Sequence, residues 1–260
     1  MTKNKIIALV VLIIVIAFVA GSNRFHQKVS TSICNVALIK IEGYLGSYAG
    51  QVIDGEEVGA SSDEIVRNLV SAEENPQIKA VLVSIDSVSG NVFAGEEIAN
   101  ALKHLTKPSI AVIRSVGLSS AYLASTGANA IYASELSSVG DIGITASYLD
   151  QTEKDKMDGY KYVEITSTKY KDAGSPHRPL TTEEKNLWIK SVKEDHDTFI
   201  AEVARNRNLD IYDVNELADG TSLNGQGALD AGLIDGIGDL FSISDVISNE
   251  IGQKADICWD

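Results

Sequence analysis

Two adjacent serines, Ser119 and Ser120, stand between Gly117 and an alanine-rich apolar run in the stretch SVGLSSAYLASTGANAIYA, residues 115–133. Serines at the start of a helix usually cap it through their side-chain oxygens. A serine in this position can also be a nucleophile, because backbone N–H groups at a helix start stabilise the oxyanion formed in acyl transfer. The residues alone leave two interpretations, a pair of caps or a nucleophile at Ser119.

A nucleophilic serine needs a base to accept its proton. The chain has four histidines, and only His177 lies in a predicted loop where it could serve. GLSSA resembles the G-x-S-x-G turn of α/β-hydrolases only in part, since Ala121 replaces the second glycine, and no histidine follows late in the chain. The other three histidines lie in the linker or on predicted helices: His26, His104 and His196.

A lysine is the alternative base, provided that burial leaves it partly neutral. The stretch TKYKDAGSPHRPLT, residues 168–181, offers Lys169 and Lys171 between a strand and a long predicted helix. Lysines in loops are normally hydrated, so the residue types alone do not select either one.

Strands and helices alternate along the predicted fold. Near-continuous apolar runs at 78–86 and 109–115 are typical of strands buried on both faces of a parallel sheet. The loops that follow these two strands, at Gly90 and at Ser119, should meet at one edge of the sheet. We expect strands at 35–45, 78–86, 109–115, 130–133 and 138–144, and helices at 61–75, 93–105, 119–126 and 181–207.

Two of the predicted helices carry specific sequence signals. The helix at 61–75 has Ser61 or Ser62 as its cap, and Ile65, Leu69 and Val70 are predicted to share its buried face. The helix at 181–207 starts with the T-x-x-E capping box from Thr181 to Glu184.

Length and charge limit the class of protein. The 260 residues suit one compact domain, and the formal net charge of −14 argues against a nucleic-acid partner, since phosphate binding needs a basic surface. Cys34 and Cys258 are the only cysteines. They could form a disulfide in an oxidising compartment or remain two buried thiols, and no Cys/His cluster suggests a metal.

The N-terminus has the pattern of a membrane anchor. Lys3 and Lys5 precede fifteen apolar residues, 6–20. We predict a signal anchor or transmembrane segment at 1–22, a linker at 23–32 and a single folded domain at 33–260. A cleaved signal peptide is the alternative. Both interpretations place the domain on the extracytoplasmic side of the cell membrane.

Five ordered motifs resemble the signal peptide peptidase SppA family, whose members are membrane-anchored Ser-Lys proteases with a crotonase/Clp-protease-like α/β fold. The family's "PGG", "SGGYYIA...ADKIYA", "GSIGV", "YKD...SP.R..T.EE" and "G..A...GL.D..G" correspond here to VSGNV, SSAYLASTGANAIYA, GDIGI, YKDAGSPHRPLTTEE and GQGALDAGLIDGIG. The matches run from about Cys34 to Leu240.

The resemblance implies a serine endopeptidase without a metal or other cofactor. It places the nucleophile at Ser119, the general base at Lys171, and the oxyanion donors at the N–H groups of Gly90 and Ser120. It implies substrates that are remnant signal peptides or other short or unfolded hydrophobic chains. It also implies a homo-oligomeric ring whose sites can combine residues of neighbouring subunits.

The chain departs from the family pattern near the expected site. Asp141 stands where the family has the serine of GSIG, and a carboxylate near Lys171 would favour its charged form, so Asp141 is a possible lysine-tuning residue. Val88-Ser89-Gly90 keeps only one glycine of PGG. These departures leave a catalytically weak or inactive peptide-binding scaffold as the alternative function. A crotonase-like acyl-CoA enzyme is disfavoured by the predicted anchor and by the YKD segment.

Overall fold

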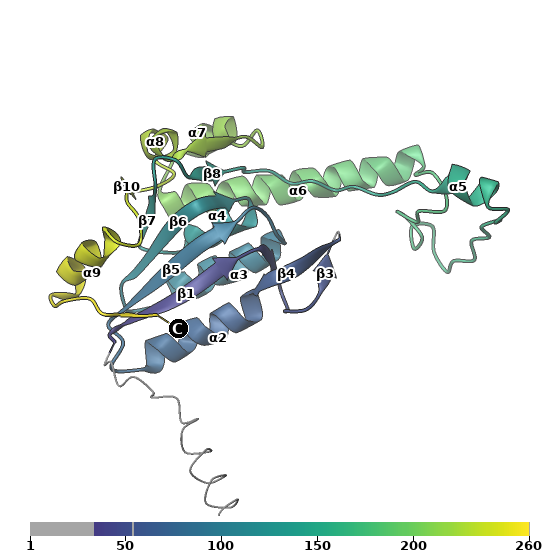
Figure 1. Cartoon of the computed structure of the whole chain (residues 1–260). Coiled ribbons are helices and arrows are strands. Elements are labelled where there is room, and N and C mark those ends of the chain that lie inside the picture. The colour runs from purple at the N-terminus through teal and green to yellow at the C-terminus, as the bar shows by residue number, and fades with distance from the viewer. Residues whose placement is uncertain (1–33, 54, 260) are drawn as a thin grey trace, which may run out of the picture. The chain divides into compact units, whose positions relative to one another are not determined.

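The computed structural model describes residues 34–53 and 55–259 (Figure 1). The predicted anchor and linker, residues 1–32, lie outside the described residues. No helix within the described ranges is long and apolar enough to cross a membrane. In chain order the elements are β1 (Val36–Glu42), β2 (Tyr44–Gly46), β3 (Val52–Ile53), β4 (Glu56–Ser61), α2 (Ser62–Glu74), β5 (Ala80–Ser87), α3 (Val92–Lys103), β6 (Ser109–Leu118), α4 (Ser120–Ser125), β7 (Ala130–Ala133), β8 (Ser138–Gly140), α5 (Thr152–Met157), α6 (Thr182–Arg207), α7 (Ile211–Leu217), β9 (Ser222–Asn224), α8 (Gly225–Asp230), β10 (Gly236–Ile237), α9 (Ile243–Ile251) and β11 (Ile257–Cys258).

The main sheet has the predicted mostly parallel arrangement. Its strand order is β10-β7-β6-β5-β1-β11, and every neighbouring pair on this path is parallel. β8 extends β6 in parallel, and β9 pairs with β8 in the antiparallel direction. The helices that connect β1, β5 and β6 are α2 and α3, as the alternating sequence pattern predicts.

The sheet is buried on both faces, because a hydrophobic core covers each side of it. Successive residues of a strand point to opposite faces, so neighbouring residues of β5 enter different cores. In β5, Val81, Val83 and Ile85 belong to the core that α2, α3, α4 and α6 complete. Ala80 and Leu82 of the same strand face a second, smaller core that includes α9. This explains why the sequence of β5 is a continuous apolar run without alternation.

The helix α2 confirms one part of its prediction and corrects another. Ser61 is the N-cap, with its Oγ accepting from the N–H of Glu64 at 3.4 Å. Ile65 and Leu69 are buried, but Val70 is 49% exposed, so its predicted place on the buried face was wrong. Ala72 is buried instead, because positions i, i+4 and i+7 share a helix face whereas i+5 does not.

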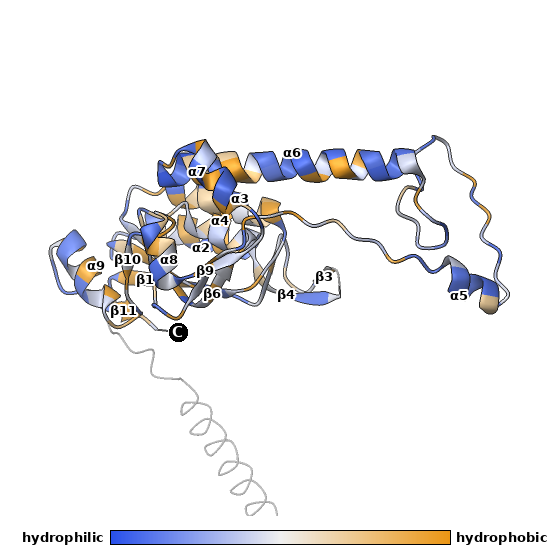
Figure 2. Ribbon diagram, turned by 90° about the horizontal axis from the view of Figure 1, so that it is seen from above, coloured by the Kyte–Doolittle hydropathy of each residue, from blue (hydrophilic) through white to orange (hydrophobic). Residues whose placement is uncertain are grey.

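The long helix α6 begins with the predicted capping box between Thr181 and Glu184. Its C-terminal part packs on the core through Phe199, Ile200 and Val203. Its N-terminal part extends beyond the sheet, and Figure 2 shows this part mostly in hydrophilic colours with separate apolar positions. Only one half of α6 is therefore held by the core.

Residues 145–181, which we call the arm, connect β8 with α6 and include α5. The arm forms no strand of the main sheet, and α5 has no buried residue. Figures 1 and 2 both show it beside the N-terminal end of α6, away from the sheet. The strand predicted at 138–144 ends at Gly140, because Asp141 takes a positive φ of 52° that interrupts extended backbone.

A disulfide joins the two cysteines. Cys34 precedes β1 and Cys258 ends β11, and their sulfur atoms are bonded across a sequence separation of 224 residues. Of the two alternatives left open by the sequence, the structure has the disulfide. It fastens the short strand β11 to the edge of β1, where only Val36 and Ala37 have β11 partners.

Candidate active site

Ser119 occupies a sharp turn between the buried strand β6 and the helix α4. Its φ of 52° and ψ of −123° are unusual for a residue with a side chain, and such values persist where the surrounding structure enforces them. Its N–H donates to the carbonyl of Gly140 at 2.8 Å, which fixes the turn to the end of β8. This strand-to-helix turn is the kind of geometry that presents a serine nucleophile in α/β enzymes.

The Ser119 side chain does not cap α4. No hydrogen bond runs from its hydroxyl to the amides of the first turn, although Ser119 holds the N-cap position. The capping interpretation therefore fails for Ser119, whose hydroxyl has no structural partner among the described residues. Ser120 lies inside the helix and is fully buried, and its Oγ has no hydrogen-bond partner in the described part of the chain.

Gly90 lies directly beside Ser120. A Cβ atom placed on Gly90 would be 2.7 Å from the Ser120 Oγ and 2.3 Å from the carbonyl oxygen of Leu45, so only glycine fits this position. The chain on either side of Gly90 is held by β2. The N–H of Leu45 donates to Ser89 O at 3.1 Å, and the N–H of Asn91 donates to Leu45 O at 2.8 Å.

This pairing decides where the Gly90 amide points. Because Leu45 bonds the residues before and after Gly90 in a parallel bridge, the Gly90 N–H faces away from β2. The N–H of Ser120 is in the first turn of α4, where amides lack a partner within the helix. The structure thus brings together Ser119, Ser120 and Gly90, with two backbone donors available.

Asp141 lies next to this group in the fold. It follows Gly140, the residue whose carbonyl accepts from Ser119, and its own N–H donates to Thr221 O at 3.0 Å. Its carboxylate has no hydrogen-bond or ion-pair partner among the described residues, and burial raises its pKa above the ordinary value of 3.8. A partly buried carboxylate without a cation is poorly stabilised, so a lysine brought to this place would be favoured.

Lys171 is not part of the same group within one chain. It lies in an exposed turn of the arm, where its N–H donates to Thr168 O at 3.3 Å. Among the described residues no hydrogen bond or ion pair uses its ammonium group, and Figure 1 shows the arm apart from β6 and α4. Lys169, the other candidate, forms an exposed ion pair with Glu183.

His177 is also in the arm and does not meet Ser119. Its Nδ1 lies 2.7 Å from Asp155 Oδ2, and its ring stacks on Tyr162 with a centroid distance of 5.3 Å. Within the described ranges no group of three His, Cys, Asp or Glu side chains could hold a metal ion.

Two arginines outside the Ser119 group form close ion pairs. Arg178 pairs with Glu184 in a bidentate arrangement, with Nη1–Oε2 at 2.9 Å and Nη2–Oε1 at 2.7 Å. Arg207 pairs with Asp235 at 2.8 Å, and Asp235 also accepts the N–H of Ile131 at 2.7 Å. Asp235 lies 28 residues from Arg207, so nothing local in the sequence points to this pair.

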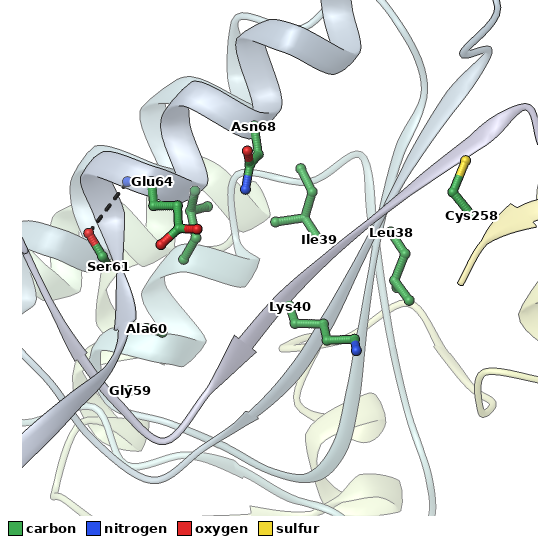
Figure 3. A pocket seen from close by; sticks show the side chains of 10 residues that line it. Leu38, Ile39, Lys40, Gly59, Ala60, Ser61, Glu64, Asn68 and Cys258 are labelled. Carbon is green, nitrogen blue, oxygen red and sulfur yellow. Dashed lines mark hydrogen bonds between the residues drawn. The ribbon is translucent and has the colours of Figure 1, made fainter. Parts of the chain in front are cut away.

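A hollow on the described surface offers a poorer candidate. It measures about 290 Å³ and lies between β1 and α2, with Lys40, Ser61, Glu64 and Asn68 among its lining residues (Figure 3). The Ser61 hydroxyl is already engaged, since it donates to Ser47 O at 3.0 Å and caps α2. Because its hydroxyl is engaged in both of these bonds, Ser61 is a poor candidate for a nucleophile.

The fold and this geometry define a class: a Clp-protease-like α/β protein with a serine at the strained entry to a short helix. The Clp protease profile matches residues 47–138. A solved structure of a mutant of the "1510-N membrane-bound stomatin-specific protease" shares the fold with a TM-score of 0.50 at 14% identity, over 82% of this chain and 84% of that one.

The Peptidase family S49 profile matches residues 101–254, and the chain belongs to this family, that of the signal peptide peptidase SppA. It is 29% identical to "Serine protease SPPA, chloroplastic" of Arabidopsis thaliana over 79% of this chain and 31% of the relative. It is 28% identical to "Protease 4" of Haemophilus influenzae over 85% of this chain and 35% of the relative. The chain therefore spans about a third of the length of each of these relatives.

Proposed function

We propose that the protein is a serine endopeptidase in which Ser119 attacks a peptide carbonyl and Lys171 of a neighbouring copy is the general base. The observation that carries this proposal is the Ser119 turn, strained and free of any capping role, beside the amides of Gly90 and Ser120. Membership in a peptidase family supports the same reaction class.

The steps follow from these positions. The neutral lysine takes the hydroxyl proton as Ser119 Oγ bonds the carbonyl carbon, and the N–H groups of Gly90 and Ser120 hold the oxyanion. The lysine then gives that proton to the leaving amine nitrogen as the C–N bond breaks. Water, deprotonated by the same lysine, hydrolyses the acyl ester and regenerates Ser119.

The position of the arm supports the proposal that Lys171 of one copy acts as the base for Ser119 of a neighbouring copy. Lys171 is exposed, and its side chain has no partner among the described residues. A lysine becomes a base only in a site that removes its hydration. The arm also carries exposed apolar side chains that a neighbouring copy could cover. They are Leu149 at 67%, Met157 at 81%, Tyr160 at 71%, Val163 at 66% and Ile165 at 93% exposure. We propose a homo-oligomeric ring on this basis, acting on remnant signal peptides or other short or unfolded hydrophobic chains.

Mixed assemblies test this arrangement. Ser119→Ala and Lys171→Ala chains, each inactive alone, are unfolded together and reassembled at equal amounts. If the dyad spans two copies, random mixing restores up to about a quarter of wild-type activity, since that share of sites receives both intact residues. A dyad within one chain restores none. If wild-type chains assemble yet never cleave a hydrophobic peptide between pH 6 and 10, the scaffold function replaces the protease.

We also propose that the domain lies on the extracytoplasmic side of the cell membrane, held by the anchor expected at residues 1–22. The disulfide between Cys34 and Cys258 supports an oxidising compartment. Labelling of cells with a membrane-impermeant maleimide, with and without prior reduction, checks this. The two cysteines should react only after reduction. An absence of labelling after reduction would contradict the location, and labelling without reductant would contradict the disulfide.

A further inference from the structure

The arm has to keep its shape largely without the core. Its contacts with α6 include an edge-on packing of Tyr148 on Trp188, with ring centroids 5.8 Å apart, and the close approach of Gly174. A Cβ on Gly174 would lie 2.6 Å from the Trp188 ring. These contacts place the turn that carries Lys171 against α6, but none of them involves Asp172, the residue directly after the lysine.

Arg178 makes the contacts that do. Its Nε donates to Asp172 Oδ2 at 3.2 Å and its Nη2 to the Asp172 carbonyl at 3.0 Å. The same guanidinium pairs with both oxygens of Glu184 and with Glu164 Oε2 at 3.0 Å. We call Arg178 with Glu164, Asp172 and Glu184 the Arg178 cluster. It uses the planar fork of arginine, which a lysine cannot reproduce.

Glu184 anchors this cluster to the start of α6. Its side chain is 4% exposed, and one of its oxygens also accepts from the N–H of Thr181 at 2.9 Å. The hydrogen bonds from Arg178 and Thr181 lower the pKa of Glu184 to about 2. Glu184 therefore stays charged, and keeps its pairing with Arg178, through the pH range in which a peptidase would be assayed.

Asp172 transmits this anchorage to the lysine, because it is the next residue after Lys171. Besides both contacts with Arg178, its Oδ1 accepts from the Tyr162 hydroxyl at 2.8 Å and its carbonyl from the Ser175 N–H at 3.1 Å. The Lys171 side chain itself makes no bond in the described part of the chain. Its backbone is fixed while its ammonium group is left free to reach outward.

We infer that Arg178 is the positioning residue for the general base: it ties the backbone beside Lys171 to the N-terminus of α6 so that the lysine reaches the neighbouring Ser119 at a set distance. This inference rests on the proposed function. A displacement of about 1 Å at a base costs about 100-fold in rate, so the loss of this clamp should reduce kcat while substrate binding persists.

The experiment uses the full chain with Arg178→Ala, Arg178→Lys and the matched control Glu183→Gln. Glu183 neighbours Glu184 in the first turn of α6, but within the described ranges its carboxylate pairs with the exposed Lys169 and with no member of the Arg178 cluster. For each variant, kcat and KM are measured on a fluorogenic hydrophobic peptide and assembly size by light scattering. Added guanidinium ion is the decisive probe, since it can occupy the space that Arg178→Ala vacates.

We expect Arg178→Ala to lower kcat about 100-fold with KM within about twofold, and Arg178→Lys to lower it about tenfold. Guanidinium should restore part of the Arg178→Ala activity and none of the Lys171→Ala activity, and Glu183→Gln should match the wild type. Wild-type kcat in Arg178→Ala overturns the inference. So does a loss explained by a smaller assembly and unmoved by guanidinium. Failure of the proposed function is distinct: Lys171→Ala then keeps full activity.

Discussion

The turn at Ser119 and the turn at Lys171 are held by contacts of opposite kinds. Ser119 joins a buried strand to a helix whose residues are all buried, and its backbone is bonded to β8. Lys171 lies in an exposed arm, where a polar cluster of one arginine and three carboxylates fixes the chain beside it. One residue is held by apolar packing and the other by ion pairs and hydrogen bonds.

This difference shows how the nucleophile and the general base can be held in separate parts of one chain. Close packing of β6 and α4 allows a backbone conformation that would be unfavourable in isolation, and so orients a nucleophile. A polar cluster keeps its geometry without a large core, so a base can be carried away from its own domain. That division suits a site assembled from two copies, and each prediction below tests one side of it.

Removal of the base should have the largest effect on rate and almost none on stability. Lys171→Ala is expected to lower kcat by about 10²–10⁴-fold, the usual contribution of a general base. The Tm of separate chains should stay unchanged, because the Lys171 side chain is exposed and has no partner among the described residues. Peptide hydrolysis and scanning calorimetry measure the two quantities, with the neighbouring Lys169→Ala as control. Equal activity of the two variants would refute the assignment of the base.

Gly90→Ala tests the packing on the Ser119 side. The new methyl group would meet Leu45 O at 2.3 Å and Ser120 Oγ at 2.7 Å, so the loop must shift. A displaced oxyanion donor should reduce kcat about 100-fold or more and leave KM nearly constant. Steady-state kinetics on the same peptide check this. An active variant with unchanged kcat would show that the Gly90 amide does not hold the oxyanion.

Ser119→Gly separates strain from chemistry. A glycine accepts the positive φ of 52° at this turn without steric cost. The free energy of unfolding of Ser119→Gly should therefore be about 1 kcal/mol larger than that of Ser119→Ala. Both variants should be inactive. Urea denaturation measures the difference. Asn208→Gly is the control, because Asn208 has a φ of 53° in the left-handed region that asparagine tolerates. Equal stability of the two Ser119 variants would mean that the turn stores no strain.

Asp141→Asn should have the smallest effect, and it should act on the stability of separate chains and on the activity of the assembly. Burial raises the pKa of Asp141, so its contribution to stability is greatest below the ordinary pKa of 3.8 and falls as pH rises through the raised value. At pH 7 the asparagine variant should therefore melt at a higher temperature than the wild type when the chains are separate, and the gain should vanish at low pH.

In the assembly, the same change should move activity. A carboxylate beside a lysine favours the ammonium form, so Asp141→Asn should bring maximal kcat at a lower pH than the wild type. A pH profile of kcat from 6 to 10 decides this. An unshifted profile would place Asp141 away from the base.

The fold could be predicted well from the sequence because its signals are local. The apolar runs of β5 and β6, the cap at Ser61 and the box at Thr181 each depend on residues within a few positions of one another. The error at Val70 arose from assigning a helix face by nearness rather than by the 100° step. The disulfide could not be chosen over free thiols, because 224 residues separate Cys34 and Cys258.

The sequence by itself determined the alternating α/β order, the serine at the start of a helix and the family motifs, since each is written in short stretches whose physics is local. Only the tertiary structure decided that Ser119 does not cap, that Gly90 touches Ser120, and that Lys171 stands on an arm outside the core. These facts depend on backbone angles and on contacts between distant segments. Such contacts form only when the sheet and helices pack, so no stretch of sequence contains them.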